Sequence, residues 1–212
     1  MIRERKNEKV PSSLLTTSKY DGEDVKAQLL EDQHEKCYIC ERKLGTDFEI
    51  EHFKSKEKYH TLRQEWTNLF MSCGYCNRKK SSLFDDNLYP LDVNIEDEIE
   101  QRIDFNQNKA LFTTAIADVP HENTVRMLHL FYNGKRKMRV IKEEHFFDEA
   151  KQKMIRFSRM VNDYLMNPTP TARSLISAEL SIGQEMLGFK YWIIRDNHLE
   201  NDFKDEIMWN KH

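Results

Sequence analysis

The chain has 212 residues, 39% of them apolar and 11% aromatic, so it is long and apolar enough for a globular protein with a real core. It contains no run of about 18 apolar residues, so no membrane span is expected, and the charged residues 1–6 precede no stretch typical of a signal peptide. We therefore expect a cytoplasmic protein. The net charge of −3 is uneven, because residues 37–84 carry nine Lys or Arg against six Asp or Glu.

Residues 1–36 form a lead-in to the first cysteine of the chain. The Pro-Ser-Ser sequence at 11–13 is expected to break any early helix. Residues 24–35 predict one short helix, because three apolar side chains fall on one side of it: Val25, Leu29 and Leu30.

The only four cysteines form two Cys-x-x-Cys pairs, Cys37 with Cys40 and Cys73 with Cys76. Each two-residue spacer lets one tight turn point both sulfurs at the same ion, which is typical of structural zinc sites. Disulfides are the alternative, but thiols stay reduced in the cytoplasm. We therefore predict a zinc site with four cysteine ligands that clamps this part of the chain.

Between and after the cysteine pairs, the pattern predicts a strand, a second strand and a helix. Residues 47–53 alternate apolar and polar side chains, and residues 68–71 are a candidate second strand. A short helix is expected from Tyr75 to about Leu83, starting at the second cysteine turn.

The residue types in this segment suit the hydrolysis of a phosphodiester, which needs a base for water, a cation on the phosphate and a group that orients the base. His52, with an ordinary pKa of about 6.5, is the candidate base. Glu51 and Asn77 offer oxygen ligands for Mg²⁺ or Mn²⁺, and Asn68 is a candidate orienter of the His52 ring through the backbone or the ring itself.

Glu51 and His52 are neighbours, and adjacent residues of a strand point to opposite faces, so the strand must end or twist there for both to meet one phosphate. Basic side chains near these residues are candidates for nucleic-acid phosphates: Lys54, Lys56, Lys79 and Lys80.

The part beyond Pro90 is predicted to be mainly helical, after possible strands at 103–105 and 111–113. Expected helices include one ending near Gly134, one at 143–165 and one at 172–187. The last is expected to bury one row of side chains: Leu175, Ala178, Ile182 and Met186. Core packing is also the preferred role of four aromatic residues: Phe146, Phe147, Tyr191 and Trp192. Residues 134–142 carry five basic side chains and no acid. We expect this segment to be a solvated surface, and contact with nucleic acid is the alternative.

At residues 37–80 the chain resembles the HNH endonucleases, and in particular their branch with two zinc-binding cysteine pairs. The resemblance implies a ββα-metal core, His52 as general base, Glu51 and Asn77 as ligands of the catalytic metal, and Asn68 as the residue that orients His52. Two positions depart from the commonest pattern: Glu51 stands where Asp is more frequent, and Ser55 where proline is often found.

The steps Ile50-Glu51-His52-Phe53 and Trp66-Thr67-Asn68-Leu69-Phe70, with the long lead-in and helical C-terminal half, look like the HNH subunits of Septu-type anti-phage systems, the PtuB family. That resemblance implies an ATPase partner, PtuA, and some relatives are associated with retrons.

We therefore expect an α+β fold with an HNH core at 37–84, an N-terminal lead-in at 1–36 and a helical, partner-binding region at 85–212. The expected function is a metal-dependent endonuclease with DNA as favoured substrate, acting in antiviral defence. Two alternatives stay open: a non-catalytic zinc adaptor that binds nucleic acid, and an HNH-type RNase that cleaves RNA or tRNA.

Overall fold

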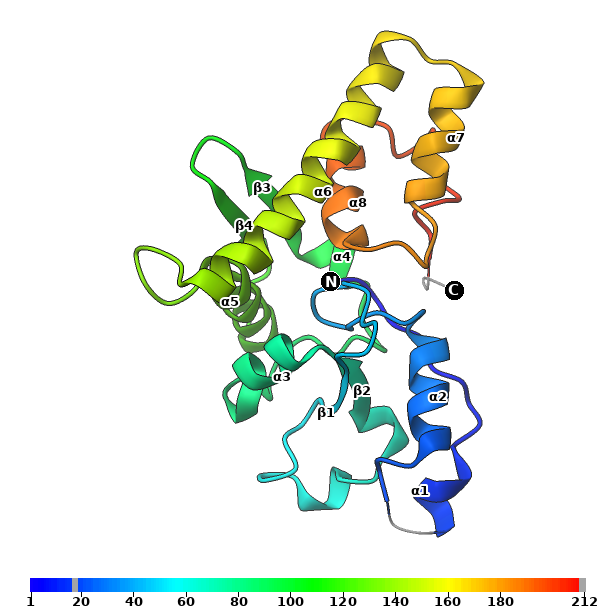
Figure 1. The fold of residues 1–212 in the computed structure, drawn as a ribbon, viewed down its shortest axis with the longest axis vertical. Coiled ribbons are helices and arrows are strands. Elements are labelled where there is room, and N and C mark those ends of the chain that lie inside the picture. Colours follow the sequence, from blue (N-terminus) through cyan, green and yellow to red (C-terminus); the bar gives the residue numbers. More distant parts are fainter. Residues whose placement is uncertain (17–18, 210–212) are drawn as a thin grey trace.

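The computed structural model, which describes residues 1–16 and 19–209, has a mixed first half and a mainly helical second half (Figure 1). The first half contains α1 (Ser12–Thr16), α2 (Glu23–Asp32), β1 (Glu49–His52), the 3-10 turns η1 (His60–Leu62) and η2 (Trp66–Asn68), β2 (Leu69–Ser72), α3 (Gly74–Lys80), η3 (Ser81–Phe84) and α4 (Ile95–Glu98). The second half contains β3 (Glu100–Asp104), β4 (Lys109–Thr113), α5 (Val119–Asn133), α6 (Ile141–Met166), α7 (Pro170–Glu179) and α8 (Leu187–Asp196). The predicted α+β class is confirmed.

The strand–strand–helix unit that the sequence predicted lies in the lower half of the molecule as Figure 1 shows it. β1 and β2 pair antiparallel, and the chain enters α3 through the second cysteine pair. The sulfur of Cys73 accepts a hydrogen bond from the backbone N–H of Cys76 at 3.5 Å, so this pair also caps the helix. α3 ends at Lys80, earlier than predicted, and η3 continues the chain as a 3-10 turn.

The lead-in holds two helices, one more than the sequence predicted. α1 starts at Ser12, directly after Pro11, because proline and serine interrupt a helix but also favour its first turn. The expected break is therefore the start of a helix. α2 matches the second prediction, and Val25 and Leu29 are fully buried on its inner side.

The second half surrounds the antiparallel β3–β4 hairpin, with α5 against β4 and α8 against β3. α6 has 26 residues and is about 39 Å long, so it reaches from the first half to the far end of the molecule, as Figure 1 shows. One apolar core joins the strand–strand–helix unit to α5 and the start of α6, and a second core lies among the end of α6, α7 and α8. The four aromatic residues predicted to be core are buried: Phe146, Phe147, Tyr191 and Trp192.

The helix predicted at 172–187 is wrong in its bounds, and of the four side chains predicted to be buried only Met186 is fully so. Thr169 accepts a hydrogen bond from the N–H of Ala172, and Pro170 follows it, so α7 starts early and ends at Glu179. Leu175 is 54% exposed and Ala178 is also exposed, whereas Ile176 and Leu180 are fully buried. The left-handed backbone of Met186, with φ of 56°, ends the intervening turn and starts α8. None of the described helices has the length and apolar content needed to cross a membrane.

Candidate active site and metal centre

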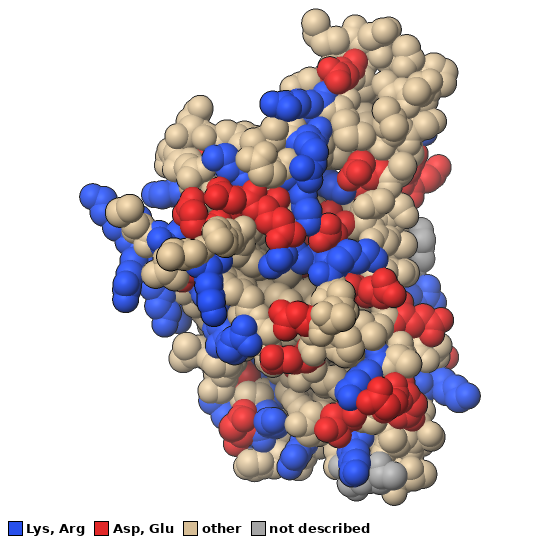
Figure 2. Space-filling view, viewed as in Figure 1, with Lys and Arg blue, Asp and Glu red and all other residues tan. Residues whose placement is uncertain are grey.

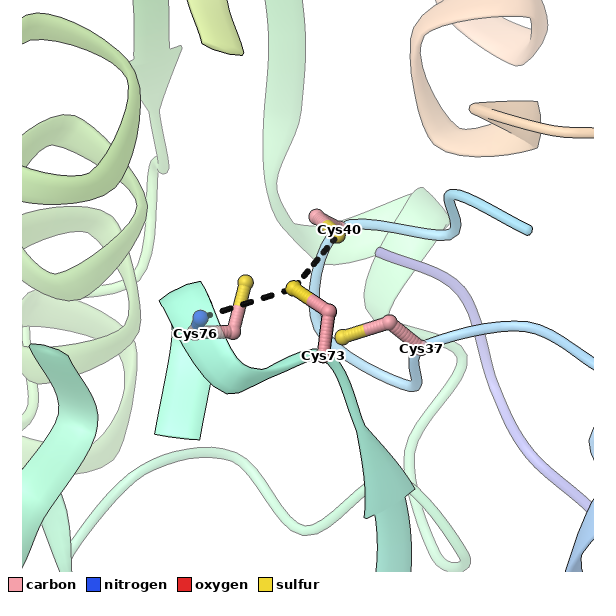
Figure 3. A group of neighbouring side chains, drawn as sticks. All are labelled: Cys37, Cys40, Cys73 and Cys76. Atoms are coloured by element: carbon pink, nitrogen blue, oxygen red, sulfur yellow. Dashed lines mark hydrogen bonds between the residues drawn. The ribbon is translucent and has the colours of Figure 1, made fainter. Parts of the chain in front are cut away.

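The four cysteine sulfurs face one another at the centre of the first half (Figure 3). Cys37 and Cys40 come from the turn after α2, Cys73 from the end of β2 and Cys76 from α3, and all four are buried. Their sulfur atoms lie within 4.8 Å of one another, with Cys40 and Cys73 at 3.9 Å. A tetrahedral zinc ion with Zn–S bonds of about 2.3 Å puts its sulfurs about 3.8 Å apart, whereas a disulfide needs about 2.05 Å. The four donors therefore fit a structural zinc ion.

Four buried thiols can ionise together only beside a cation. Burial raises the pKa of the Cys40 and Cys76 thiols well above their ordinary values. Zinc binds thiolates, and its charge offsets the cost of ionising buried thiols. The predicted zinc ligands thus form one site, which ties the turn before β1 to the helix after β2.

A pocket of about 290 Å³ opens beside this unit, and Glu51, His52 and Asn77 all line it. The two neighbours on β1 meet the same pocket because the strand ends at His52. The expected end of the strand is therefore observed, without a glycine or proline to cause it. Asn77 reaches the pocket from α3, whose position the zinc ligands fix.

The ring of His52 is fixed in one orientation. Its Nε2 atom lies 3.0 Å from the carbonyl oxygen of Arg63, and the ring packs edge-on against Tyr20 with centroids 4.7 Å apart. A carbonyl oxygen only accepts hydrogen bonds, so Nε2 carries the proton and Nδ1 is left to accept one. Burial lowers the pKa of His52, which keeps the imidazole neutral near pH 7.

Asn68 does not touch the His52 ring. Its amide oxygen accepts a hydrogen bond from the N–H of Lys54 at 2.8 Å, and its amide nitrogen donates to the carbonyls of Lys54 and Leu62, both at 3.0 Å. These bonds tie the end of β1 to the turn that presents the Arg63 carbonyl. Any orientation of His52 by Asn68 therefore acts through the backbone, one of the two routes that we expected.

Glu51 is buried in a polar network that the sequence analysis missed. One carboxylate oxygen accepts a hydrogen bond from the Tyr38 hydroxyl, and the other lies 2.7 Å from the ammonium of Lys80. Burial raises the pKa of Glu51, while Lys80 and Tyr38 oppose that shift. The Lys80 ammonium also donates to the carbonyls of His52 at 3.2 Å and Phe53 at 2.8 Å.

Of the four lysines suggested as phosphate contacts, one lines the pocket. Lys56 does so, with its ammonium 3.3 Å from the Tyr20 hydroxyl. Lys54 pairs with Asp86 at 2.9 Å and Lys79 with Glu143 at 2.7 Å. Lys80 is 1% exposed, so in this structure it supports Glu51 instead of facing solvent.

Asn77 makes one further contact that the sequence analysis missed. Its amide nitrogen donates to the carboxylate of Glu49, which leaves the amide oxygen for a cation. Period-two alternation places Glu49 and Glu51 on the same face of β1, a signal that could have identified Glu49. Carboxylate and amide oxygens suit Mg²⁺ or Mn²⁺, which need few protein ligands because water and phosphate oxygens complete their shells. Glu51 and Asn77 therefore fit a catalytic divalent ion.

Comparison with known proteins agrees with this geometry. Residues 37–83 match the family model described as HNH endonuclease. Septu protein PtuB from Bacillus thuringiensis is 41% identical over 61 residues, which are 27% of this chain and 24% of that protein. The match thus spans about a quarter of the length of that curated relative. The predicted resemblance to zinc-clamped HNH proteins and to PtuB is confirmed over this segment.

Proposed function

We propose that this chain, whose residues 37–83 form an HNH endonuclease domain, is a metal-dependent endonuclease that hydrolyses phosphodiester bonds, with DNA as its favoured substrate. The observation that carries the proposal is that Glu51, His52 and Asn77 line one pocket beside four clustered cysteines. The chemistry of these groups matches the needs of phosphodiester hydrolysis.

In the proposed mechanism, Nδ1 of His52 takes the proton from the attacking water. The Arg63 carbonyl, which already accepts from Nε2–H, stabilises the positive charge that then develops on the ring. Asn68 keeps the Arg63 turn in place through its bond to the neighbouring Leu62 carbonyl. A divalent ion held by Glu51 and Asn77 would polarise the scissile phosphate and stabilise the leaving oxygen.

Each remaining residue of the site has a proposed supporting role. Lys80 and Tyr38 fix the Glu51 carboxylate, and Lys56 at the pocket wall meets a phosphate of the bound strand. Lys54 and Lys79 would reach phosphate only by giving up their present ion pairs. A zinc ion held by the four cysteines would take no part in the reaction and would hold α3, and with it Asn77, against β1.

We further propose that the chain is the nuclease of an anti-phage complex in the cytoplasm, together with a PtuA-like ATPase. The similarity to PtuB supports this role. Residues 85–212 are the proposed partner-binding region. Addition of the ATPase should change the rate of cleavage, and the change should depend on which nucleotide is supplied. A cleavage rate that stays the same with and without the ATPase and with every nucleotide would count against the complex.

The experiment that tests the nuclease is cleavage of plasmid DNA and of total RNA by the zinc-loaded protein with Mg²⁺, Mn²⁺ or EDTA. His52→Ala should lower the rate by about 100- to 10,000-fold, the usual contribution of a general base. His145→Ala, which changes an exposed histidine on α6, should have no effect and serves as the matched control. Undiminished cleavage by His52→Ala would refute the assigned base.

The same assay separates the alternatives. Cleavage of RNA but not DNA would reassign the substrate. An adaptor that only binds nucleic acid would bind equally well in EDTA and would be indifferent to Glu51→Gln, whereas the nuclease should lose turnover under both changes.

A further inference from the structure

The loop between α5 and α6 presents a concentrated positive charge. Lys135, Arg136 and Lys137 are exposed, and no acid occurs from 134 to 142. Figure 2 shows lysine and arginine side chains gathered on the side of the molecule where Figure 1 places this loop. The cluster is therefore a surface feature and not part of either apolar core.

The loop borders a groove of about 660 Å³ whose lining is strongly cationic. Its charged basic lining residues come from the hairpin and the loop: Lys109, Lys135, Arg136, Lys137 and Arg139. His129 of α5 also lines the groove, but burial lowers its pKa, so it adds no charge near pH 7. Among the described residues that line the groove, Glu144 is the one acid, and it lies 3.4 Å from Arg139. The groove thus keeps a clear excess of positive charge, which favours a polyanionic ligand.

The base of the loop is fixed, whereas its tip is free to bind. The guanidinium of Arg139 stacks 3.6 Å from the Phe147 ring centroid and donates to the carbonyls of Tyr132 at 2.8 Å and Asn108 at 2.7 Å. Gly134, with φ of 75°, lets the chain turn away from α5 beside Glu143. By contrast, no ion pair among the described residues involves the three cations of the tip.

Both ends of this loop rest on the helix that carries Asn77. The Tyr75 hydroxyl donates to the Phe131 carbonyl at 2.6 Å, at the end of α5. Lys79 lies 2.7 Å from Glu143, which in turn accepts a hydrogen bond from the N–H of Val140 at 3.0 Å. α3 has seven residues and is about 10 Å long, and the phosphates of one strand of a DNA duplex are spaced about 3.4 Å along its axis. The pocket and the base of the loop therefore both meet α3, whose length corresponds to a few nucleotides.

We propose that the basic groove beside the α5–α6 loop binds the phosphate backbone of double-stranded DNA a few nucleotides from the cleaved bond. The identity of the ligand rests on the proposed function; the positive charge of the groove does not. Lysine and arginine contacts to phosphate carry no sequence information, so the groove positions any duplex over the pocket. An acidic protein surface is the competing ligand, and the attachment of the loop to α3, the helix that carries Asn77, favours DNA.

The test compares a loop variant, Lys135→Gln with Arg136→Gln and Lys137→Gln, with a control of equal charge change. The control is Arg156→Gln with Arg159→Gln and Lys204→Gln, three exposed cations outside the groove. Binding of a fluorescent 30-base-pair duplex is measured by anisotropy in EDTA from about 50 to 200 mM salt, a range over which phosphate contacts lose much of their strength. Hydrolysis of bis(p-nitrophenyl) phosphate, which is too small to reach the groove, is measured with Mn²⁺.

The loop variant should bind DNA at least about tenfold more weakly. The slope of the logarithm of its binding constant against the logarithm of the salt concentration should become less steep by up to about 2.7, or about 0.9 for each lost phosphate contact. The control should bind like the wild type, and all three proteins should hydrolyse the small diester equally. Wild-type DNA affinity and salt slope in the loop variant would overturn the proposal. Binding of polyglutamate is measured as well. A loop variant that loses binding to polyglutamate but keeps binding to DNA would assign the groove to an acidic protein. Absence of diester hydrolysis in the wild type would count against the nuclease and leave the binding result valid.

Discussion

Residues 37–84 and the far end formed by α6, α7 and α8 both have apolar cores, but they bury different numbers of polar groups. The first region buries four hydrogen-bonded polar side chains, each at most 6% exposed: Glu51, His52, Asn68 and Lys80. It also contains the buried cluster of four cysteines. In the second region, the core is apolar and aromatic, and the buried Lys190 pairs with Glu179 at its edge. The polar core costs stability but positions reactive groups, whereas the apolar core supplies stability without chemistry. Changes in the two regions should therefore separate activity from stability.

Removal of zinc should have the largest effect. Structural zinc sites contribute about 10–16 kcal/mol in small zinc-binding peptides, as much as the whole stability of many domains. Cys76→Ser, or a strong chelator, should therefore expose 37–84 to hydrogen exchange and abolish cleavage, while α7 and the end of α6 stay protected. If zinc removal increased hydrogen exchange equally in both regions, or in neither, zinc would not stabilise residues 37–84 selectively.

Breaking the buried ion pair should come next. Lys80→Met leaves the Glu51 carboxylate buried without its cation, which should lower the free energy of unfolding by about 3–5 kcal/mol. Adding Glu51→Leu should restore most of that stability, because an apolar pair can replace a buried ion pair, yet cleavage should be lost. Denaturant unfolding and DNA cleavage measured on the same samples test this. A double variant that is less stable than Lys80→Met would show that the pair is not coupled.

A matched loss in the apolar core should cost as much stability and no activity. Phe157 is 1% exposed, and Phe157→Ala should lower the free energy of unfolding by about 3–5 kcal/mol through the lost apolar contacts and the cavity left behind. Below its midpoint of thermal unfolding, the variant should cleave DNA at the wild-type rate. A large loss of turnover in the folded variant would mean that the second core acts on the pocket.

Asn68→Ala should produce a smaller loss of stability with a clear loss of rate. It removes three hydrogen bonds to the backbone, at about 1–3 kcal/mol for the groups left unpaired. A shift of the Arg63 carbonyl by about 1 Å could slow turnover about 100-fold through His52. Asn68→Ala should thus lower kcat with little change in KM. An unchanged kcat in this variant would show that the turn that presents the Arg63 carbonyl does not need the hydrogen bonds of Asn68.

The smallest effect concerns a partly exposed network between α4 and α5. His121 lies 2.6 Å from both Asp118 and Glu98. Burial lowers the pKa of His121, but these two carboxylates outweigh burial and raise it overall. A raised folded pKa means that the stabilisation is complete below about pH 6.5, the unfolded value, and is lost as the pH rises through the folded pKa.

His121→Ala should therefore cost about 1 kcal/mol at pH 5.5 and less at pH 9. Urea unfolding of the variant and wild type across this range measures the difference. A cost that grows with pH would mean that the imidazole is bound in its neutral form.

The sequence predicted the zinc ligands and the strand–strand–helix order because cysteine spacing and period-two alternation are local signals. The clustering of the four cysteines and the order of the elements are confirmed, and the side chains of Glu51, His52 and Asn77 line one pocket. The support of Glu51 by Tyr38 and Lys80 could not be predicted, because it joins three separate segments. The bounds of α7 were wrong because apolar spacing alone did not register the cap at Thr169 or the turn before Met186.

The central claim is that Glu51 and Asn77 hold one catalytic metal ion beside His52, and Mn²⁺ binding followed by electron paramagnetic resonance tests it most directly. Loss of an outer-shell partner already weakens metal sites by about 10–100-fold, so Glu51→Gln and Asn77→Ala in the zinc-loaded protein should each weaken Mn²⁺ at least that much. Glu57→Gln, which changes an exposed acid at the same pocket, should leave the affinity near the wild-type value. Wild-type Mn²⁺ affinity in Glu51→Gln and Asn77→Ala would contradict the account.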